Sequence, residues 1–290
     1  MDTLVLLVFN LPSFPGGEFY LVEYTEPSIL PALPIYRHLK TKTTMLDTTI
    51  KNYPGSKGAS GAFQKIISEI PRCDRFIEAM CGSAIISSKI KGVANIVIND
   101  IDGHLVDRIK LPIAKKEKLS YEDLIDKYDC GGPKTVFYFD PPYLLETRSY
   151  QGKLYKFDWN KQDHKKFIAK AFTVKSDCMI SHYPCSIYDK AFKDWRKIYY
   201  NSMTRAGVRK ECLYMNFKQP ALLLDYRYVG RDYTDRQRIK RKVEKMICRL
   251  NNLPGQERST ILSALIDHYN YLDTAKLQQM QKRLKAQTLF

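Results

Sequence analysis

The chain has 290 residues, enough to bury one sizeable α/β core with some sequence left for an appended element. Its content of 44% hydrophobic and 12% aromatic residues speaks against intrinsic disorder. Forty-seven Lys and Arg against 31 Asp and Glu give a net charge of +16, which favours a polyanionic partner because each neutralised phosphate releases bound counterions. A strongly charged, solvated surface is the alternative explanation of the same balance.

The first 45 residues are apolar and rich in proline, and they are expected to form an N-terminal extension of unknown role. The run from Thr3 to Leu11 is too short to span a bilayer, and it lacks the basic start of a signal peptide. It predicts a strand followed by a turn at residues 12–17. Seven cysteines are scattered without CxxC pairs or zinc-type spacing, which indicates reduced thiols in a cytoplasmic protein and no metal site.

Residues 46–228 alternate β-rich runs with helical patterns, which predicts a mostly parallel sheet with helices on both faces. The clearest strands are Arg75–Glu78, Asn95–Ile98, Thr135–Phe139 and Cys178–Ser181. Each apolar run ends in small or acidic residues, at the edge where parallel sheets bind their ligands. This part of the chain is the expected catalytic domain, of the Rossmann-like α/β class.

A loop of small residues precedes the first of these strands. It reads Asn52-Tyr53-Pro54-Gly55-Ser56-Lys57-Gly58, and an apparent helix around Phe63–Ile70 follows it. A lysine within such a loop is suited to hold a ligand carboxylate. The loop is not a P-loop, because the P-loop spacing and its Lys-Ser/Thr ending are absent.

A second loop follows the first strand, at Glu78-Ala79-Met80-Cys81-Gly82-Ser83. Gly82 permits a ligand to approach the backbone closely, although any strand-to-helix turn can contain Gly-Ser. The next strand ends at Asn99-Asp100-Ile101-Asp102. An acidic residue about 20 positions after a glycine loop is where nucleoside-binding sheets hydrogen-bond ribose hydroxyls. A helix N-cap is the alternative role for one of the two aspartates.

The tetrapeptide Asp140-Pro141-Pro142-Tyr143 directly follows the buried run Val136–Phe139. A carboxylate and a backbone carbonyl that accept the two protons of an exocyclic amine stabilise the charge that develops during methyl transfer. Asp140 supplies the carboxylate, and the prolines fix the chain so that a carbonyl faces the substrate. Tyr143 offers a ring on which a flipped-out base stacks. A strand-to-turn junction that merely contains two prolines is the alternative.

The order of these motifs resembles the Dam-type (class alpha) DNA adenine-N6 methyltransferases. The likeness continues downstream in Phe157-Asp158-Trp159 with His164 and Phe167, in Cys178–Tyr183 and in Gly207–Asn216, so that it covers roughly residues 50–218. The resemblance implies an S-adenosylmethionine-dependent methyltransferase that flips a base out of DNA, in phage DNA modification or a bacterial restriction-modification system.

Carried over residue by residue, the resemblance implies that Lys57 binds the methionine carboxylate. It also implies that Asp100 binds the ribose, with Asp102 as the competing choice. Asp140, Pro141, Pro142 and Tyr143 are the implied catalytic residues. The implied cofactor-binding residues are Tyr53, Lys57, Glu78, Cys81, Gly82, Ser83, Asp100 and Asp102.

Two departures from the family pattern matter. Ala79-Met80 and Ala84 stand where the family usually has Pro-Phe and often a second glycine. Only residues 103–139 separate Asp102 from Asp140, so the target-recognition domain that better-known members insert there is missing. We therefore expect low sequence specificity, with a compact sequence reader in residues 1–45, in the Leu144–Lys156 loop or in the C-terminal helices as the alternative.

Residues 229–290 are expected to form a basic helical region. Apolar residues recur at helical spacing from Ile239 to Leu250, and Pro254-Gly255 separates this helix from further ones around residues 261–269 and 277–284. We expect cations here and near residue 207 to contact the DNA backbone, with a solvated helix packed on the core as the alternative. These candidate contacts are Arg205, Arg209, Lys210, Arg236, Arg238, Lys240, Arg241, Lys242, Lys245 and Arg249.

The expected function is methyl transfer from S-adenosylmethionine to the N6 amino group of adenine in DNA, without a membrane partner. An RNA adenine-N6 methyltransferase, for example one acting on rRNA, is one alternative. A catalytically inactive fold that only binds nucleic acid is another, and the intact Asp-Pro-Pro-Tyr speaks against it. Cytosine-N4 enzymes usually have Ser in place of Asp140.

Overall fold

The computed structural model describes residues 6–9, 20–23, 50, 53–58, 61–148, 150, 152–204, 207–265 and 267–268. The chain divides into two compact units, residues 1–228 and residues 229–290. Among the described residues, no helix is both long and apolar enough to cross a membrane.

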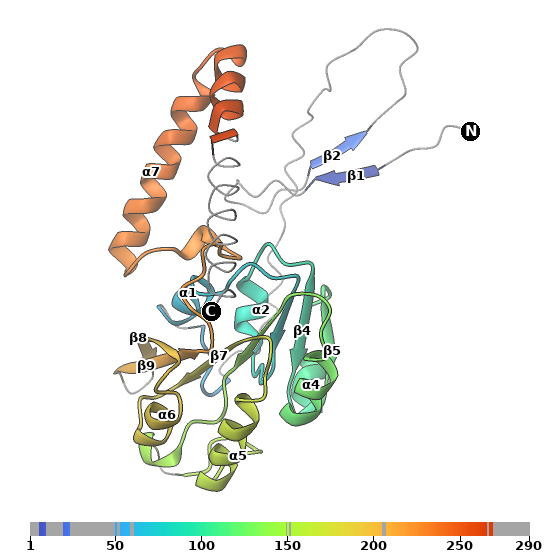
Figure 1. Ribbon diagram of the computed structural model, residues 1–290, viewed down its shortest axis with the longest axis vertical. Coiled ribbons are helices and arrows are strands. Elements are labelled where there is room, and N and C mark those ends of the chain that lie inside the picture. The colour runs from blue at the N-terminus through green and yellow to red at the C-terminus, as the bar shows by residue number, and fades with distance from the viewer. Residues whose placement is uncertain are drawn as a thin grey trace, which may run out of the picture. The chain divides into compact units, whose positions relative to one another are not determined.

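A seven-stranded sheet forms the centre of the first unit (Figure 1). The strands lie in the order β5-β4-β3-β6-β7-β9-β8, in which the first five are parallel and β9 is antiparallel to both neighbours. Counted from β3, this is the order 3-2-1-4-5-7-6 of the Rossmann-like methyltransferase fold, and the expected fold class is confirmed. The strands are β3 (Arg75–Glu78), β4 (Asn95–Asn99), β5 (Ala114–Glu117), β6 (Thr135–Phe139), β7 (Asp177–His182), β8 (Arg196–Thr204) and β9 (Gly207–Met215).

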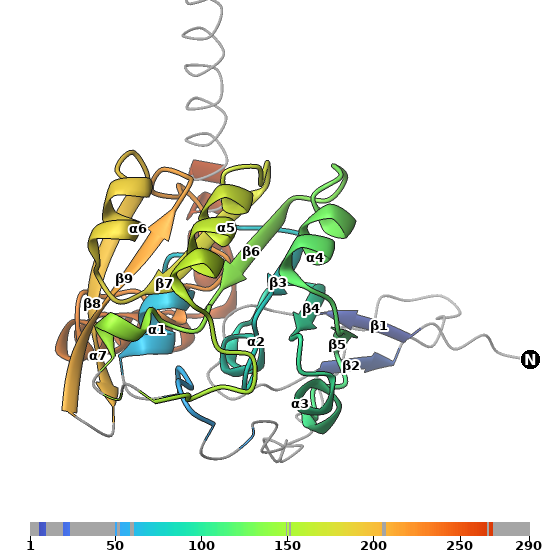
Figure 2. The same cartoon turned by 90° about the horizontal axis from the view of Figure 1, so that it is seen from below.

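Helices cover both faces of this sheet (Figure 2). Successive side chains of a strand point to opposite faces, so Phe76 and Ile77 enter two different cores. The core of Phe76 is closed by α1 (Ala62–Ile67), α2 (Ile85–Lys89) and α3 (Gly103–Arg108). The core of Ile77 is closed by α4 (Tyr121–Tyr128), α5 (Lys161–Ala171) and α6 (Ser186–Ala191). Burial on both faces explains why the central strands are almost continuously apolar in sequence.

Segments that are far apart in sequence meet next to the sheet of the first unit. The amide of Leu224 donates a hydrogen bond to the carbonyl of Ile70 at 2.9 Å, and Pro71 and Leu223 form an isolated antiparallel bridge. The segment before β3 is thereby joined to the segment after β9. Short 3-10 turns at Leu145–Thr147 and Tyr226–Tyr228 complete the described elements of this unit.

The four strands expected with most clarity are all present, with ends that differ by at most one residue. The apolar run near the N-terminus contains β1 (Leu6–Phe9), which pairs with an unexpected second strand, β2 (Tyr20–Glu23). The helix expected around Phe63–Ile70 is α1, which ends three residues earlier at Ile67.

The second unit is helical where it is described. Its main element is α7 (Tyr233–Asn251), which begins after Asp232, a residue that caps the helix by accepting from the amide of Asp235. Residues 255–265 form a second helix, and the third helix expected around residues 277–284 lies outside the described residues. No residue of α7 is buried, and Val243 and Met246 on its apolar side are more than half exposed.

Candidate active site

A cavity of about 930 Å³ opens in the first unit at the carboxyl ends of β3, β4 and β6. This is the edge of a parallel α/β sheet where ligands bind, and the volume lies within the range of roughly 300–1,000 Å³ that small-molecule sites occupy. The structure brings all twelve of the sequence-predicted catalytic and cofactor-binding residues to its wall. They are Tyr53, Lys57, Glu78, Cys81, Gly82, Ser83, Asp100, Asp102, Asp140, Pro141, Pro142 and Tyr143.

The glycine loop between β3 and α2 has a backbone that requires Gly82. Its φ of +49° is in the left-handed region, and an added Cβ would lie 2.5 Å from the ring of Tyr53. Glu78, at the end of β3, accepts from the amide of Ser87 at 2.7 Å, so its carboxylate holds the first turn of α2 against the loop. Burial raises the pKa of the Glu78 carboxyl to about 7 and that of the Cys81 thiol well above its usual range. Cys81 is therefore a buried thiol without thiolate character.

The two acids after β4 have different surroundings. The Asp100 carboxylate accepts from the amides of Gly82 at 3.1 Å and Asp102 at 3.0 Å, so it holds the shape of both loops. The Asp102 side chain does not cap α3, although Asp102 is the residue before that helix. Its buried Oδ1 has no hydrogen-bond partner among the described residues, and Lys156 Nζ is 3.6 Å away. Asp102 lines the cavity with 25% of its side chain exposed, and it is the acid of the pair that accepts no loop amide through Oδ1.

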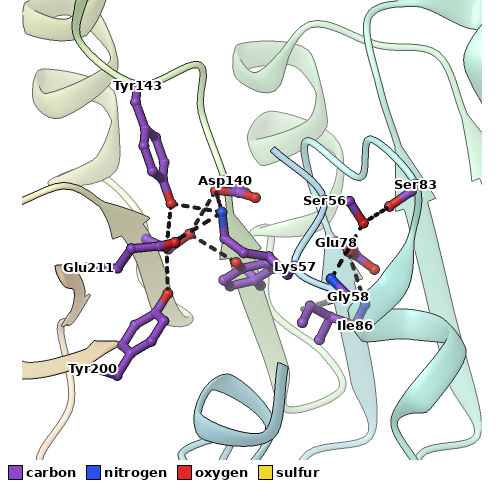
Figure 3. A network of polar contacts seen from close by, with 12 residues as sticks. Ser56, Lys57, Gly58, Glu78, Ser83, Ile86, Asp140, Tyr143, Tyr200 and Glu211 are labelled. Atoms are coloured by element: carbon purple, nitrogen blue, oxygen red, sulfur yellow. Dashed lines mark hydrogen bonds and ion pairs between the residues drawn. The ribbon is translucent and has the colours of Figure 1, made fainter. Parts of the chain in front are cut away.

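Asp140 directly follows β6 and lines the cavity, and Figure 3 shows its polar contacts. Its Oδ1 accepts from the Ser181 hydroxyl at 2.8 Å and is 2.8 Å from the ammonium of Lys57. Burial raises the pKa of the Asp140 carboxyl, Lys57 opposes this rise, and Glu211 adds to it. The pKa of Lys57 is raised because Asp140 and Glu211 together outweigh the effect of its burial. Lys57 therefore faces two carboxylates, and its assignment to the methionine carboxylate stays a prediction.

Tyr143 joins the catalytic loop to the antiparallel end of the sheet. Its hydroxyl donates to Glu211 Oε2 at 2.7 Å and accepts from Lys57 Nζ at 2.7 Å. Glu211 also accepts from the Tyr200 hydroxyl at 2.9 Å (Figure 3). In the sequence Glu211 was only one residue of the Gly207–Asn216 segment that resembles the family, and its place in the cavity was not predicted. No local motif marks it, because its partners lie on other strands and loops.

A buried histidine supports the loop from behind. His182 Nε2 accepts from the amide of Leu144, the residue after Tyr143, at 2.9 Å, and its Nδ1 is 2.7 Å from the carbonyl of Tyr183. These contacts fix the tautomer with hydrogen on Nδ1. Burial lowers the pKa of His182 to about 3, so the ring stays neutral and keeps accepting. Its ring is stacked on Tyr188 at 4.0 Å between centroids.

The predicted nucleic-acid contacts are spread over both units. Lys210 on β9 is exposed and lies over the exposed ring of Tyr199, at 4.6 Å from its centroid, and Arg209 precedes it. Arg205 lies outside the described residues. In the second unit the seven predicted cations all belong to α7 and none is buried, which leaves them accessible to a polyanion.

No protein-family model matches the chain, and no curated protein is similar enough in sequence to count as a match. Solved structures with a similar course of the chain include the 23S rRNA methyltransferase ErmE, with a TM-score of 0.37 and 10% identity over 63% of this chain and 74% of that one. An rRNA methylase from Streptococcus thermophilus has a TM-score of 0.31 and 8% identity over 53% and 91%.

A precorrin-8w decarboxylase from Methanobacterium thermoautotrophicum is similar to the same degree, with a TM-score of 0.35 and 10% identity over 59% of this chain and 98% of that one. The chain thus has a distant structural similarity to S-adenosylmethionine-dependent methyltransferases and to an enzyme described as a decarboxylase. The likeness lies in the fold alone, and folds of this kind support many different functions.

Proposed function

We propose that this protein transfers a methyl group from S-adenosylmethionine to the N6 amino group of adenine in DNA. The observation that carries the proposal is that the Asp140–Tyr143 loop lines the same cavity as the glycine loop and the two acids after β4. A site for an amino group and a site for a nucleoside cofactor therefore share one enclosed space.

The residues around the glycine loop fit the cofactor. Gly82 lets the ring of Tyr53 pack against the loop backbone at the cavity wall, and Asp102 lines the cavity with 25% of its side chain exposed, as contact with a ribose hydroxyl would require. Asp100 would then support the loop and border the same hydroxyls. When bound, S-adenosylmethionine supplies an electrophilic methyl group on a sulfonium.

The catalytic loop supplies the acceptors that the target amine needs. Asp140 accepts one amino proton, and a backbone carbonyl of the loop accepts the other, which favours a pyramidal nitrogen and stabilises positive charge on it. Pro141 and Pro142 restrict the backbone that presents this carbonyl. A base in this cavity has to leave the double helix first, because its amino group cannot otherwise reach a carboxylate at the end of β6.

A nucleic acid is the proposed partner because of charge, and the order of the sequence motifs favours DNA over RNA. The net charge is +16, and α7 alone presents seven of the predicted cations on an unburied helix. The stretch from Asp102 to Asp140 builds only α3, β5, α4 and β6, all elements of the first unit. We therefore propose affinity through the DNA backbone and low sequence specificity, since reading base edges needs side chains placed in a groove.

One experiment tests the reaction and the substrate together. The protein is incubated with methyl-labelled S-adenosylmethionine and, in parallel, with mixed-sequence duplex DNA and with rRNA. The modified base is identified by mass spectrometry and mapped by sequencing. We expect N6-methyladenine in DNA at many sequence contexts, and none with Asp140→Ala. Label only in rRNA would contradict DNA as the substrate, and methylation confined to one short motif would contradict low specificity.

The role of α7 is tested separately by charge reversal. Reversal of three cations should weaken DNA binding equally across sequences and reduce the salt slope by about one unit for each phosphate that the variant no longer neutralises. An unchanged slope would remove α7 from the DNA-binding surface. The reversed residues are Arg241, Lys242 and Lys245, and the control reverses the exposed lysines 165, 190 and 193 of the first unit.

A further inference from the structure

The ammonium of Lys57 lies closer to the carboxylate of Asp140 than to that of Glu211, and all three residues line the cavity. Its Nζ is 2.8 Å from Asp140 Oδ1 and 3.6 Å from Glu211 Oε2. The three side chains are nearly buried, with 7% of Lys57, 17% of Asp140 and 4% of Glu211 exposed. One positive charge thus faces two negative ones in a place where water screens little.

The ammonium of Lys57 contacts one of the two oxygens of the carboxylate that is proposed to bind the substrate amine. Asp140 Oδ1 already accepts from Lys57 and from Ser181, so an amino group that donates to this oxygen competes with the lysine. Lys57 also donates to the hydroxyl of Tyr143 and lies 4.7 Å from the centroid of its ring. Both side chains of the catalytic loop that are proposed to hold the base therefore contact Lys57 in this structure (Figure 3).

Glu211 is a second carboxylate near the Lys57 ammonium, and hydrogen bonds fix its position. It is fixed on β9 by hydrogen bonds from the hydroxyls of Tyr143 and Tyr200. Burial raises the pKa of its carboxyl, but Lys57 and the hydroxyl donors outweigh this effect, so the pKa lies below its ordinary value and Glu211 is ionised at neutral pH. A small displacement of Lys57 would bring its Nζ from 3.6 Å to direct contact with this carboxylate.

We propose that Glu211 is a positioning residue that takes over the Lys57 ammonium when the target amino group binds Asp140. Lys57 keeps Asp140 paired while the cavity holds no base, and it stays charged and inside the protein during turnover because Glu211 accepts it. The inference rests on the proposed function, since it assumes that an amino group binds Asp140.

A double-mutant cycle tests this exchange. Glu211→Gln leaves Asp140 as the only anion paired with Lys57 among the described residues, so the lysine competes more strongly with the substrate and kcat for DNA methylation should fall by about tenfold or more. S-adenosylmethionine affinity, measured by calorimetry, should change by less than about threefold. In the Lys57→Met background the same substitution removes one of two unpaired like charges, so kcat should stay the same or rise.

The cycle has a matched control and a second variant. Glu69→Gln removes a buried carboxylate that is paired with Arg196 at 2.6 Å and does not line the cavity, so its effect on kcat should be small and equal in both backgrounds. Glu211→Asp keeps the charge and should retain more activity than Glu211→Gln. It also keeps the proposal testable if the Gln variant fails to fold.

The outcomes separate this inference from the proposed function. Equal fold-losses for Glu211→Gln in the presence and absence of Lys57 would overturn the exchange, because Glu211 would then act only through its tyrosine partners. Equal losses for the Asp and Gln variants would overturn it as well. If the wild-type protein methylates neither DNA nor rRNA, the proposed function fails, and the exchange fails with it.

Discussion

Replacing Asp140 by Asn removes one charge from the cavity with little change of shape. At an effective dielectric constant near 20, charges 2.8 Å apart attract by about 6 kcal/mol and charges 3.6 Å apart by about 5 kcal/mol. The variant loses the first attraction, and Lys57 keeps the second through Glu211. Because the ammonium is still paired, we expect a stability loss of about 1–2 kcal/mol, below the roughly 3–5 kcal/mol of a buried pair broken outright.

The catalytic loss should be far larger than the loss of stability. Asn offers a neutral acceptor where the carboxylate stabilised positive charge on the amine, and removal of one such preorganised group costs about 10²–10³ in kcat. A single-turnover assay with labelled S-adenosylmethionine and duplex DNA measures this loss, and calorimetry measures cofactor affinity, which should not change. The melting temperature should fall by roughly 2–8 °C.

Asp225→Asn is the matched control for this substitution. Asp225 is a buried aspartate paired with Arg227 at 2.6 Å, and it does not line the cavity. The Asp225→Asn substitution should lower the melting temperature, but it should not lower kcat when kcat is measured at a temperature where the variant is folded. Near-normal kcat for Asp140→Asn would refute the role of its charge, and a loss of cofactor binding would place Asp140 in the cofactor site.

Three further substitutions test the rest of the cavity and the core. Asp102→Ala should weaken S-adenosylmethionine binding by about 1–3 kcal/mol in calorimetry, with little change in melting temperature. If the affinity is unchanged, Asp102 does not bind the ribose and Asp100 is the acid that does. Gly82→Ala should cost about 1–3 kcal/mol of stability and lower cofactor affinity, because its φ is positive and the new Cβ meets Tyr53 at 2.5 Å; an unaffected urea midpoint would contradict that strain. Burial lowers the pKa of His164 from an ordinary 6.5 to about 4. Between these two pH values the ring binds a proton only in the unfolded state. The contribution of the neutral ring to stability is therefore present above pH 6.5 and is lost as the pH falls towards 4. Compared with wild type, His164→Gln should reduce acid destabilisation by up to about 1.4 kcal/mol per pH unit in urea titrations; parallel curves would show that the ring is protonated in the folded protein too.

The central strands were predictable because they are apolar on both faces and end in recognisable residues. β5 (Ala114–Glu117) was not, because it is an edge strand with the sequence Ala-Lys-Lys-Glu, and lysines on an edge hide the β pattern while they protect the sheet from pairing. Its position next to β4 follows from the topology of the finished sheet and not from its own side chains.

The candidate site was predictable as a set of loops but not as a network. Each loop follows its own strand or precedes its own helix, so local residue types revealed it. The contact of Tyr143 with Glu211 joins residues 68 positions apart, and that of Lys57 with Tyr143 joins residues 86 positions apart. Such pairs are set by strand order and register, which a single sequence does not report. The different surroundings of Asp100 and Asp102 were likewise not predictable, because they depend on which of the two carboxylates accepts from the loop amides.

The bridge between Pro71 and Leu223, with the hydrogen bond from Leu224 to Ile70, places the start and the finish of the sheet-building segment side by side. Chain termini that lie close together can be connected by a short linker while new termini are opened in an exposed turn. In this protein a short link between residues 71 and 223 could therefore close the stretch from β3 to β9 on itself, with new ends opened in an exposed turn and Asp140 and Glu211 left in place. The spatial arrangement of the cavity is in this sense independent of the order in which its parts are encoded.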